Sequence, residues 1–116
     1  NIWLKKLILN QPITVYSKNT IINLSSREFI SKIISKINYI NPGAYEIRSE
    51  VEMTLIELLD FFREITKSKS KVIIKKNNPI KIPRIYNNLS DICNIKYTIN
   101  DFTKDIKNIL NYKLNV

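Results

Sequence analysis

The sequence contains no histidine and a single cysteine, and this lack excludes several kinds of site. One cysteine cannot form an internal disulfide, and without histidine the common zinc-ligand sets cannot be assembled. A general acid or base would have to be a carboxylate, a lysine or a tyrosine. Cys93 lies in a segment expected to form a short helical turn, where a small buried hydrophobic residue is the simplest interpretation. A lone free cysteine fits a reducing, cytoplasmic setting.

Glycine is nearly absent, and long apolar runs are missing altogether. The chain has one glycine and four prolines, against averages of about 7% and about 5%, so most residues should lie in regular helices and strands. No apolar run approaches the roughly 20 residues that span a bilayer, so we expect no membrane association. The 116 residues, 44% of them hydrophobic, suit a single domain covering 1–116. Because the chain starts at Asn1 rather than at a methionine, we expect it to be a fragment of a longer polypeptide.

Four segments have the apolar periodicity of helices, and they cover residues 2–9, 25–37, 54–65 and the stretch from 100 onward. Ser25-x-x-Glu28 and Thr54-x-x-Glu57 have the form of capping boxes, in which the two side chains satisfy free backbone N–H groups. Asn100 is expected to cap the last helix. Acidic residues one turn apart on these helices indicate solvated faces, so no catalytic residue is assigned.

Three short strands are predicted, at residues 13–17, 44–49 and 71–76. Helices placed between strands favour parallel or mixed pairing. The expected fold class is therefore α/β, a small lobe of about four helices and three short strands with mixed or parallel pairing. Three short strands form a weak sheet on their own, so we expect the lobe to dock on a larger body.

The first helix is more apolar than a small core needs. Its apolar residues are Ile2, Trp3, Leu4, Leu7, Ile8 and Leu9. An exposed apolar surface of this size is typical of an interface. We therefore expect the first helix to be the docking surface, with self-association through it as one outcome.

The positive charge suggests a competing function. A net charge of +9 and a pI near 9.7 would attract nucleic acid through its phosphates. The cations are dispersed, however, and lysine greatly outnumbers the arginine that base readout favours, so nucleic-acid binding is disfavoured. A basic binding or assembly module, with a nucleic-acid or protein partner and no enzymatic role, remains the alternative function.

Four segments together carry a resemblance to a known family: Pro-Ile-Thr-Val-Tyr at 12–16, Gly-Ala-Tyr-Glu-Ile-Arg-Ser at 43–49, Asn-Pro to Arg at 78–84, and Tyr-Thr-Ile-Asn-Asp-Phe at 97–102. In this order they resemble the C-terminal substrate-binding part of the extended short-chain dehydrogenases/reductases, the NAD-dependent sugar-nucleotide epimerases and dehydratases. The chain lacks the family's glycine-rich turn and its Tyr-x-x-x-Lys pair. The resemblance thus implies a lobe that binds a sugar nucleotide but is not catalytic alone. NAD would be held by a separate dinucleotide-binding half.

The same resemblance implies a ligand face. Val15 and Tyr16 would flank the nucleotide base or ribose, and Asn77 or Asn78 would lie beside the diphosphate. Taken without the resemblance, the same residues fit a core valine, an aromatic at a strand end and an ordinary turn before a proline.

The chain departs from the family at its two diphosphate-binding arginines. Ile21 or Ile22 stands near the first position, and the two asparagines occupy the second. Asparagine can donate a hydrogen bond to phosphate but lacks the charge and the planar fork of arginine. The resemblance leaves three readings open: a different ligand, weaker binding, or substitution by Lys75, Lys76 or Lys81.

Overall fold

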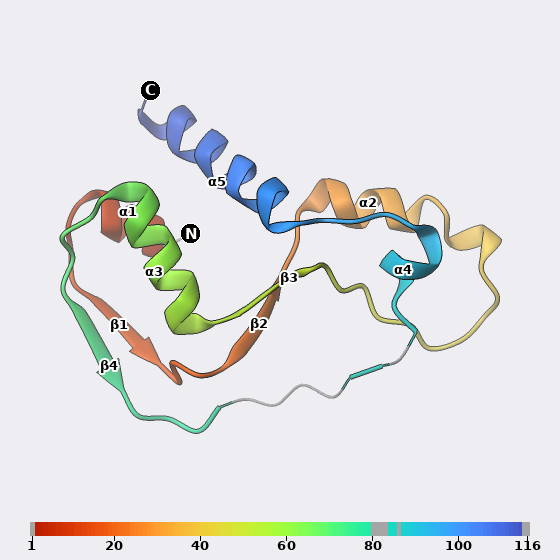
Figure 1. Ribbon diagram of the computed structural model, residues 1–116, viewed down its shortest axis with the longest axis horizontal. Helices are drawn as coiled ribbons and strands as arrows, with labels where there is room; N and C mark the ends of the chain where they lie inside the picture. Colours follow the sequence, from red (N-terminus) through yellow and green to blue (C-terminus); the bar gives the residue numbers. More distant parts are fainter. Residues whose placement is uncertain (1, 80–83, 86, 115–116) are drawn as a thin grey trace. The chain divides into compact units, whose positions relative to one another are not determined.

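The computed structural model describes residues 2–79, 84–85 and 87–114, and it confirms the α/β class (Figure 1). In chain order the elements are α1 (Ile2–Ile8), β1 (Ile13–Tyr16), β2 (Ile21–Leu24), α2 (Arg27–Ile34), the 3-10 turn η1 (Ile37–Tyr39), β3 (Val51–Thr54), α3 (Leu55–Thr66), β4 (Val72–Lys75), α4 (Leu89–Cys93) and α5 (Ile99–Leu114). The described residues thus contain five α-helices and four strands, one more of each than expected. None of these helices combines the length and apolar character that crossing a bilayer requires.

The chain packs as two compact units, each made of two separate stretches of sequence. Residues 1–22 and 53–82 make the first unit, and residues 23–52 and 83–116 make the second. Within the first unit, β1 and β4 form a parallel pair, as expected, with Ile13 opposite Val72 and Tyr16 opposite Lys75. A separate sheet pairs β2 with β3 in antiparallel orientation.

The core of the first unit comes from α1, β1 and α3. Helix α1 contacts both α3 and β1. The buried apolar side chains are Leu4, Leu7, Ile13, Val15, Leu58, Leu59 and Phe62. Part of the apolar surface of α1 is therefore used inside the unit, while Ile2 remains 72% exposed and Leu9 lies exposed just beyond the helix.

The second unit has its own core, in which α2 contacts α4. Its buried apolar side chains are Phe29, Ile33, Val51, Leu89, Tyr97, Phe102, Ile106 and Leu110. The rings of Phe29 and Tyr97 lie 5.7 Å apart between centroids, within the range of favourable aromatic pairs. The predicted helical turn around Cys93 is confirmed as α4, and Cys93 itself is half-buried.

One of the three predicted helix caps is correct. Thr54 caps α3 and accepts a hydrogen bond from the Glu57 backbone N–H at 3.2 Å. The cap predicted at Ser25 is wrong, because Ser26 accepts the bond from the Phe29 N–H at 3.0 Å. Two adjacent serines offered the same chemistry, and the position of Phe29 and Ile33 in the core selects the second.

The cap predicted at Asn100 is also wrong, because the helix already includes Ile99. Thr98 and Asp101 form a reciprocal pair instead. The Thr98 N–H and hydroxyl donate to the Asp101 carboxylate at 2.9 and 3.0 Å, and the Asp101 N–H donates to the Thr98 hydroxyl at 3.4 Å. This is the geometry of a capping box with aspartate in place of glutamate.

The strand predicted at residues 44–49 does not form. A single bridge joins Glu46 to Asn88, and the Asn88 side chain then takes the place of a strand partner. Its Oδ1 accepts from the Arg48 N–H at 2.9 Å and its Nδ2 donates to the Arg48 carbonyl at 3.1 Å. The Asn88 amide thus pairs with both backbone groups of Arg48 in place of a neighbouring strand. The observed strand, β3, lies further along the chain.

Candidate functional site

The candidate site is a cleft of about 490 Å³ in the first unit, at the carboxyl ends of β1 and β4. It is lined by Lys18, Asn19, Ile74, Lys75, Lys76, Asn77, Asn78 and Pro79. Both arrows of the parallel pair point toward this end in Figure 1. In open α/β sheets the carboxyl ends of the strands are where ligands usually bind. The position of the cleft therefore marks it as the leading candidate in this unit.

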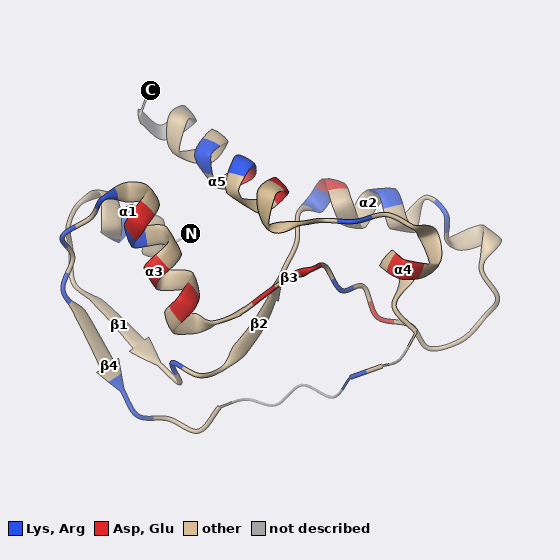
Figure 2. Cartoon of the chain, in the orientation of Figure 1, with Lys and Arg blue, Asp and Glu red and all other residues tan. Residues whose placement is uncertain are grey.

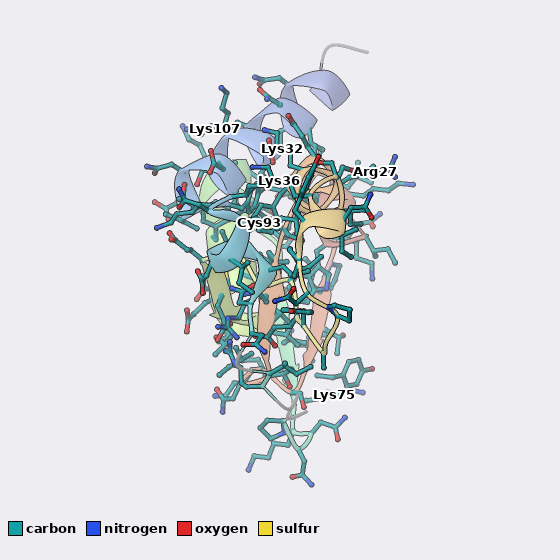
Figure 3. All side chains as sticks on the ribbon, turned by 90° about the vertical axis from the view of Figure 1, so that its right-hand side faces the viewer. Arg27, Lys32, Lys36, Lys75, Cys93 and Lys107 are labelled. Atoms are coloured by element: carbon teal, nitrogen blue, oxygen red, sulfur yellow. The ribbon has the colours of Figure 1, made fainter. Side chains whose placement is uncertain are left out.

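The charge of the cleft is positive. Lys18, Lys75 and Lys76 are all exposed, and none of the three has an ion pair within the described part of the chain. Among the described residues, no carboxylate lines the cleft. Figure 2 shows blue at the end of β4 and in the turn after β1, and Figure 3 labels Lys75 among the side chains at this end. Three ammonium groups around one cleft favour an anionic ligand.

The cleft has two arms, the turn after β1 and the segment after β4, and a hydrogen bond joins them. The Ser17 hydroxyl donates to the Asn78 carbonyl at 2.7 Å, across 61 positions of sequence. Ser17 adopts a left-handed backbone conformation with φ 54°, which turns the chain sharply after β1. The first turn of α3 fixes the same turn, since Ile56 N–H donates to the Lys18 carbonyl at 3.1 Å. The side chains of the turn are thus placed against the segment after β4.

The structure brings two of the four predicted site residues together. Asn77 and Asn78 are exposed and both line the cleft. Val15 is fully buried and outside the cleft lining, and Tyr16 is 56% exposed but also outside it. Their roles in binding stay predictions.

Two of the three lysines considered as substitutes for the family's arginines, Lys75 and Lys76, line the same cleft. Lys81 lies outside the described residues. Sequence reasoning missed Lys18 and Asn19 as lining residues, although the turn that holds them follows a predicted strand.

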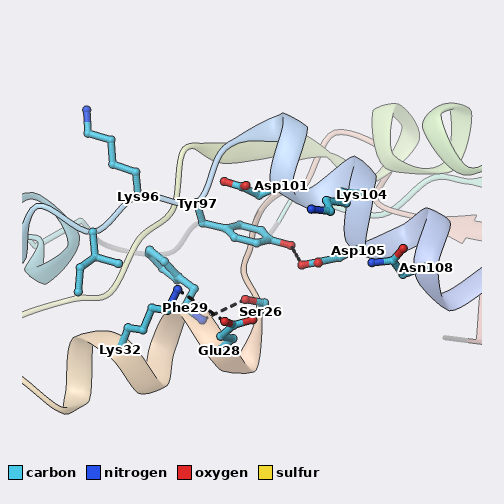
Figure 4. A pocket seen from close by; sticks show the side chains of 11 residues that line it. Ser26, Glu28, Phe29, Lys32, Lys96, Tyr97, Asp101, Lys104, Asp105 and Asn108 are labelled. Atoms are coloured by element: carbon cyan, nitrogen blue, oxygen red, sulfur yellow. Dashed lines mark hydrogen bonds and ion pairs between the residues drawn. The ribbon is translucent and has the colours of Figure 1, made fainter.

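The second unit contains a cleft of a different character, with a volume of about 400 Å³ (Figure 4). Its lining residues are Ser26, Glu28, Phe29, Lys32, Ile95, Lys96, Tyr97, Asp101, Lys104, Asp105 and Asn108. Three lysines and three carboxylates cancel in formal charge. The Lys32 Nζ lies 3.5 Å from the Glu28 Oε1, which makes an ion pair within α2. This balance makes the second cleft a weaker candidate for an anion.

Tyr97 and Asp105 dominate the chemistry of the second cleft. The Tyr97 hydroxyl donates to the Asp105 carboxylate at 2.6 Å. Burial, this hydrogen bond and the nearby negative charges together raise the pKa of Tyr97 far above its ordinary value. Hydrogen bonds from Thr98 lower the pKa of Asp101. Tyr97 therefore stays a neutral donor at physiological pH and serves to hold α5 in place.

Within the described residues, no group of three or more histidine, cysteine, aspartate or glutamate side chains is arranged to hold a metal ion. The acids of the second cleft are engaged by Tyr97, Thr98 and Lys32 instead.

Comparison with known proteins places the fold with epimerase-like structures. No protein-family model matches the sequence. No curated protein matches it either. Among solved structures, the UDP-glucose 4-epimerase of Thermus thermophilus, in complex with NAD, matches with a TM-score of 0.61 and 13% identity. The match covers 80% of this chain and 32% of that one, so the chain spans about a third of its length. At this identity the likeness establishes the fold alone.

Proposed function

We propose that residues 1–116 are the substrate-binding lobe of an NAD-dependent sugar-nucleotide epimerase or dehydratase. The observation that carries the proposal is the epimerase-like fold, matched over 80% of the chain. The cationic cleft at the carboxyl ends of β1 and β4 supports it, because a sugar nucleotide carries a doubly charged diphosphate. The ordered sequence segments that resemble this family are a second, separate support.

The lining residues suggest how the diphosphate would be held. Lys18, Lys75 and Lys76 would supply the positive charge that the family obtains from arginine. The side-chain amides of Asn77 and Asn78 would donate to phosphate oxygens. Lysine acts on phosphate as a point charge rather than through a planar fork, so we expect the diphosphate to be held with less geometric constraint than by arginine. Val15 and Tyr16 remain proposed neighbours of the base or ribose.

Hydride chemistry is assigned to a separate dinucleotide-binding half, which would hold NAD and the tyrosine–lysine pair. On this proposal the chain alone turns over no substrate. The proposed compartment is the cytoplasm, which suits both NAD chemistry and a free Cys93.

Binding to the 116-residue chain tests the proposal directly. UDP-glucose, dTDP-glucose and GDP-mannose would be titrated by calorimetry, with pyrophosphate and free glucose as reference ligands. We expect at least one sugar nucleotide to bind more tightly than pyrophosphate. Lys75→Gln with Lys76→Gln should weaken that binding, while Lys5→Gln, an exposed lysine on α1, should not.

Two results would contradict the proposal. The first is equal affinity for pyrophosphate and for every sugar nucleotide, since the cleft would then recognise charge alone. The second is turnover of a sugar nucleotide by the isolated chain when NAD is supplied, because the catalytic groups would then have to lie within residues 1–116.

One observation favours a second candidate, a basic binding or assembly module. Residues 1–22 and 53–82 hold ten lysines and arginines against three acidic residues, a formal charge of +7. The salt dependence of binding distinguishes a nucleic-acid-binding module from a sugar-nucleotide-binding lobe. Phosphate-driven binding of nucleic acid should weaken by orders of magnitude between low and moderate salt, whereas a sugar nucleotide should also be selected by its base and sugar.

A further inference from the structure

In the described part of the chain, strand β4 pairs with β1 alone and so has a partner on only one of its two edges. The Ile13 N–H donates to the Lys71 carbonyl at 2.9 Å, which fixes the register of the ladder. Since alternate residues of a strand direct their backbone groups to opposite edges, Val72 and Ile74 present their N–H and C=O groups to the open edge. Those groups have no backbone partner among the described residues.

The open strand also leaves apolar surface uncovered. Ile73 is 39% and Ile74 is 48% exposed, and the two side chains lie on opposite faces of the strand. On the neighbouring strand, Ile13 and Val15 are buried at 1% and 0% exposure. Ile74 stands beside Val15 in the register, yet only Val15 is covered. The exposure therefore belongs to β4 and its edge, not to the sheet as a whole.

Lysines lie at both ends of this strand. Lys69 and Lys71 precede it, Lys75 is its last residue and Lys76 follows it. All four are exposed without an ion pair in the described residues. Lysine on an edge strand hinders pairing with a like strand, so a second copy of this chain is repelled. The same lysines attract an acidic segment. The positive charge at this edge therefore favours an acidic segment over a second copy of this chain.

We propose that the open edge of β4 binds an acidic, extended polypeptide segment by β-strand addition. Backbone groups of the segment would pair with Val72 and Ile74, and its aliphatic side chains would cover the exposed isoleucines. Its carboxylates would meet the lysines at either end of the strand. Peptide-binding domains use the same combination of main-chain pairing and side-chain contacts.

A polypeptide fits this edge better than a nucleic acid does. Single-stranded nucleic acid is bound largely by stacking on aromatic side chains, and β4 consists of valine, two isoleucines and a lysine. A row of free N–H and C=O groups matches another backbone instead. The proposal rests on the open edge of β4 and does not require sugar-nucleotide binding, although Ile74, Lys75 and Lys76 also line the cleft.

Fluorescence anisotropy with short labelled peptides tests the proposal on the 116-residue chain. The probe alternates glutamate with valine and isoleucine; one reference peptide replaces glutamate with lysine, and another is N-methylated at alternate backbone positions. We expect the acidic probe to bind and the lysine peptide to fail. N-methylation should weaken binding at least about tenfold, because it removes main-chain hydrogen bonds without changing charge.

Two protein variants locate the contact. Lys71→Gln should weaken the acidic probe about two- to fivefold, the range for a partly exposed ion pair, while Lys5→Gln on α1 should leave it unchanged. Val72→Pro removes an outward N–H at the first residue of the strand, where proline is tolerated, and should abolish binding. Circular dichroism would check that the variant is folded, and the N-methylated peptide tests the same bond without altering the protein.

The proposal is overturned if the N-methylated peptide binds as well as the probe, since only charge would then be recognised. It is also overturned by a dissociation constant above about 1 mM, by tighter binding of a single-stranded oligonucleotide, or by dimerisation of the chain that blocks the probe. UDP-glucose titrations run in parallel separate the two proposals. Lys71 and Val72 do not line the cleft, so their variants should leave sugar-nucleotide affinity unchanged.

Discussion

Removing one hydroxyl should show whether the cleft is preorganised. In Ser17→Ala the bond from the Ser17 hydroxyl to the Asn78 carbonyl, 2.7 Å long, is lost. A neutral hydrogen bond of this kind contributes about 1 kcal/mol net to stability. The left-handed backbone of Ser17 is no easier for alanine, so the substitution changes little besides the hydrogen bond. Asn78 is exposed, and water can satisfy its freed carbonyl, so the expected loss of stability is no more than about 1 kcal/mol.

Ser35→Ala provides a matched control. The Ser35 hydroxyl donates to the Lys32 carbonyl, also at 2.7 Å, but spans only three positions at the end of α2. Both variants should lower the free energy of unfolding by similar, small amounts in urea titrations followed by circular dichroism. Of the two hydroxyls, that of Ser17 joins the two arms of the cleft and that of Ser35 does not. Ser17→Ala alone should therefore weaken UDP-glucose binding, by up to about fivefold if the lost bond contributes about 1 kcal/mol to the binding free energy.

The comparison has a clear refuting result. Equal UDP-glucose affinity in Ser17→Ala and in the unaltered chain would show that the bond does not order the cleft. Equal weakening by Ser17→Ala and Ser35→Ala would attribute the effect to general destabilisation instead.

Four further predictions follow from the two units. Asn78→Arg, in the chain together with its dinucleotide-binding half, should tighten sugar-nucleotide binding by about 1.5–3 kcal/mol, as a hydrogen bond to a charged group would. Unchanged affinity by calorimetry would show that the phosphate site does not lie at Asn78. Because folding raises the pKa of Tyr97, the folded state keeps the Tyr97 proton when the unfolded chain loses it. The free energy of unfolding should therefore fall as pH rises above about 10, and Tyr97→Phe should reduce this fall in urea titrations at a series of pH values. Leu59→Ala should cost about 2–5 kcal/mol in urea unfolding, since Leu59 is fully buried; a cost below that range would mean that the site collapses around the cavity. Ile2→Glu should reduce any self-association through α1 measured by sedimentation, and Trp3 emission independent of protein concentration would argue against that interface.

The features that the sequence predicted well depend on residues close together in the chain. Thr54 and Glu57 lie three positions apart, immediately before an apolar stripe, and Thr54 caps the helix as expected by accepting the Glu57 N–H. Of the two readings given for residues 15 and 16, the core valine and the strand-end aromatic match the burial of Val15 and the exposure of Tyr16. In each case the deciding interaction lies within one helical turn or between strand neighbours.

The features that were missed depend on contacts between distant residues. Asn88 satisfies the Arg48 backbone from 40 positions away, and nothing near residues 44–49 signals that an amide will replace a strand partner. Lys18 entered the cleft for the same reason, because the bond that joins its turn to Asn78 spans 61 positions. Strand β2 has consecutive isoleucines and no clear alternation, so its pairing with β3 had no local pattern to indicate it.

The division of each unit into two separated stretches has a consequence for how the protein is made. Residues 1–22 leave the ribosome well before residues 53–82, and β1 must wait for β4 to be synthesised before the parallel ladder can close. The second unit must wait in turn for residues 83–116. Long-range closure of this kind slows folding. No single cut between residues 23 and 82 leaves either unit whole, and premature termination before residue 74 would leave out lining residues of both clefts.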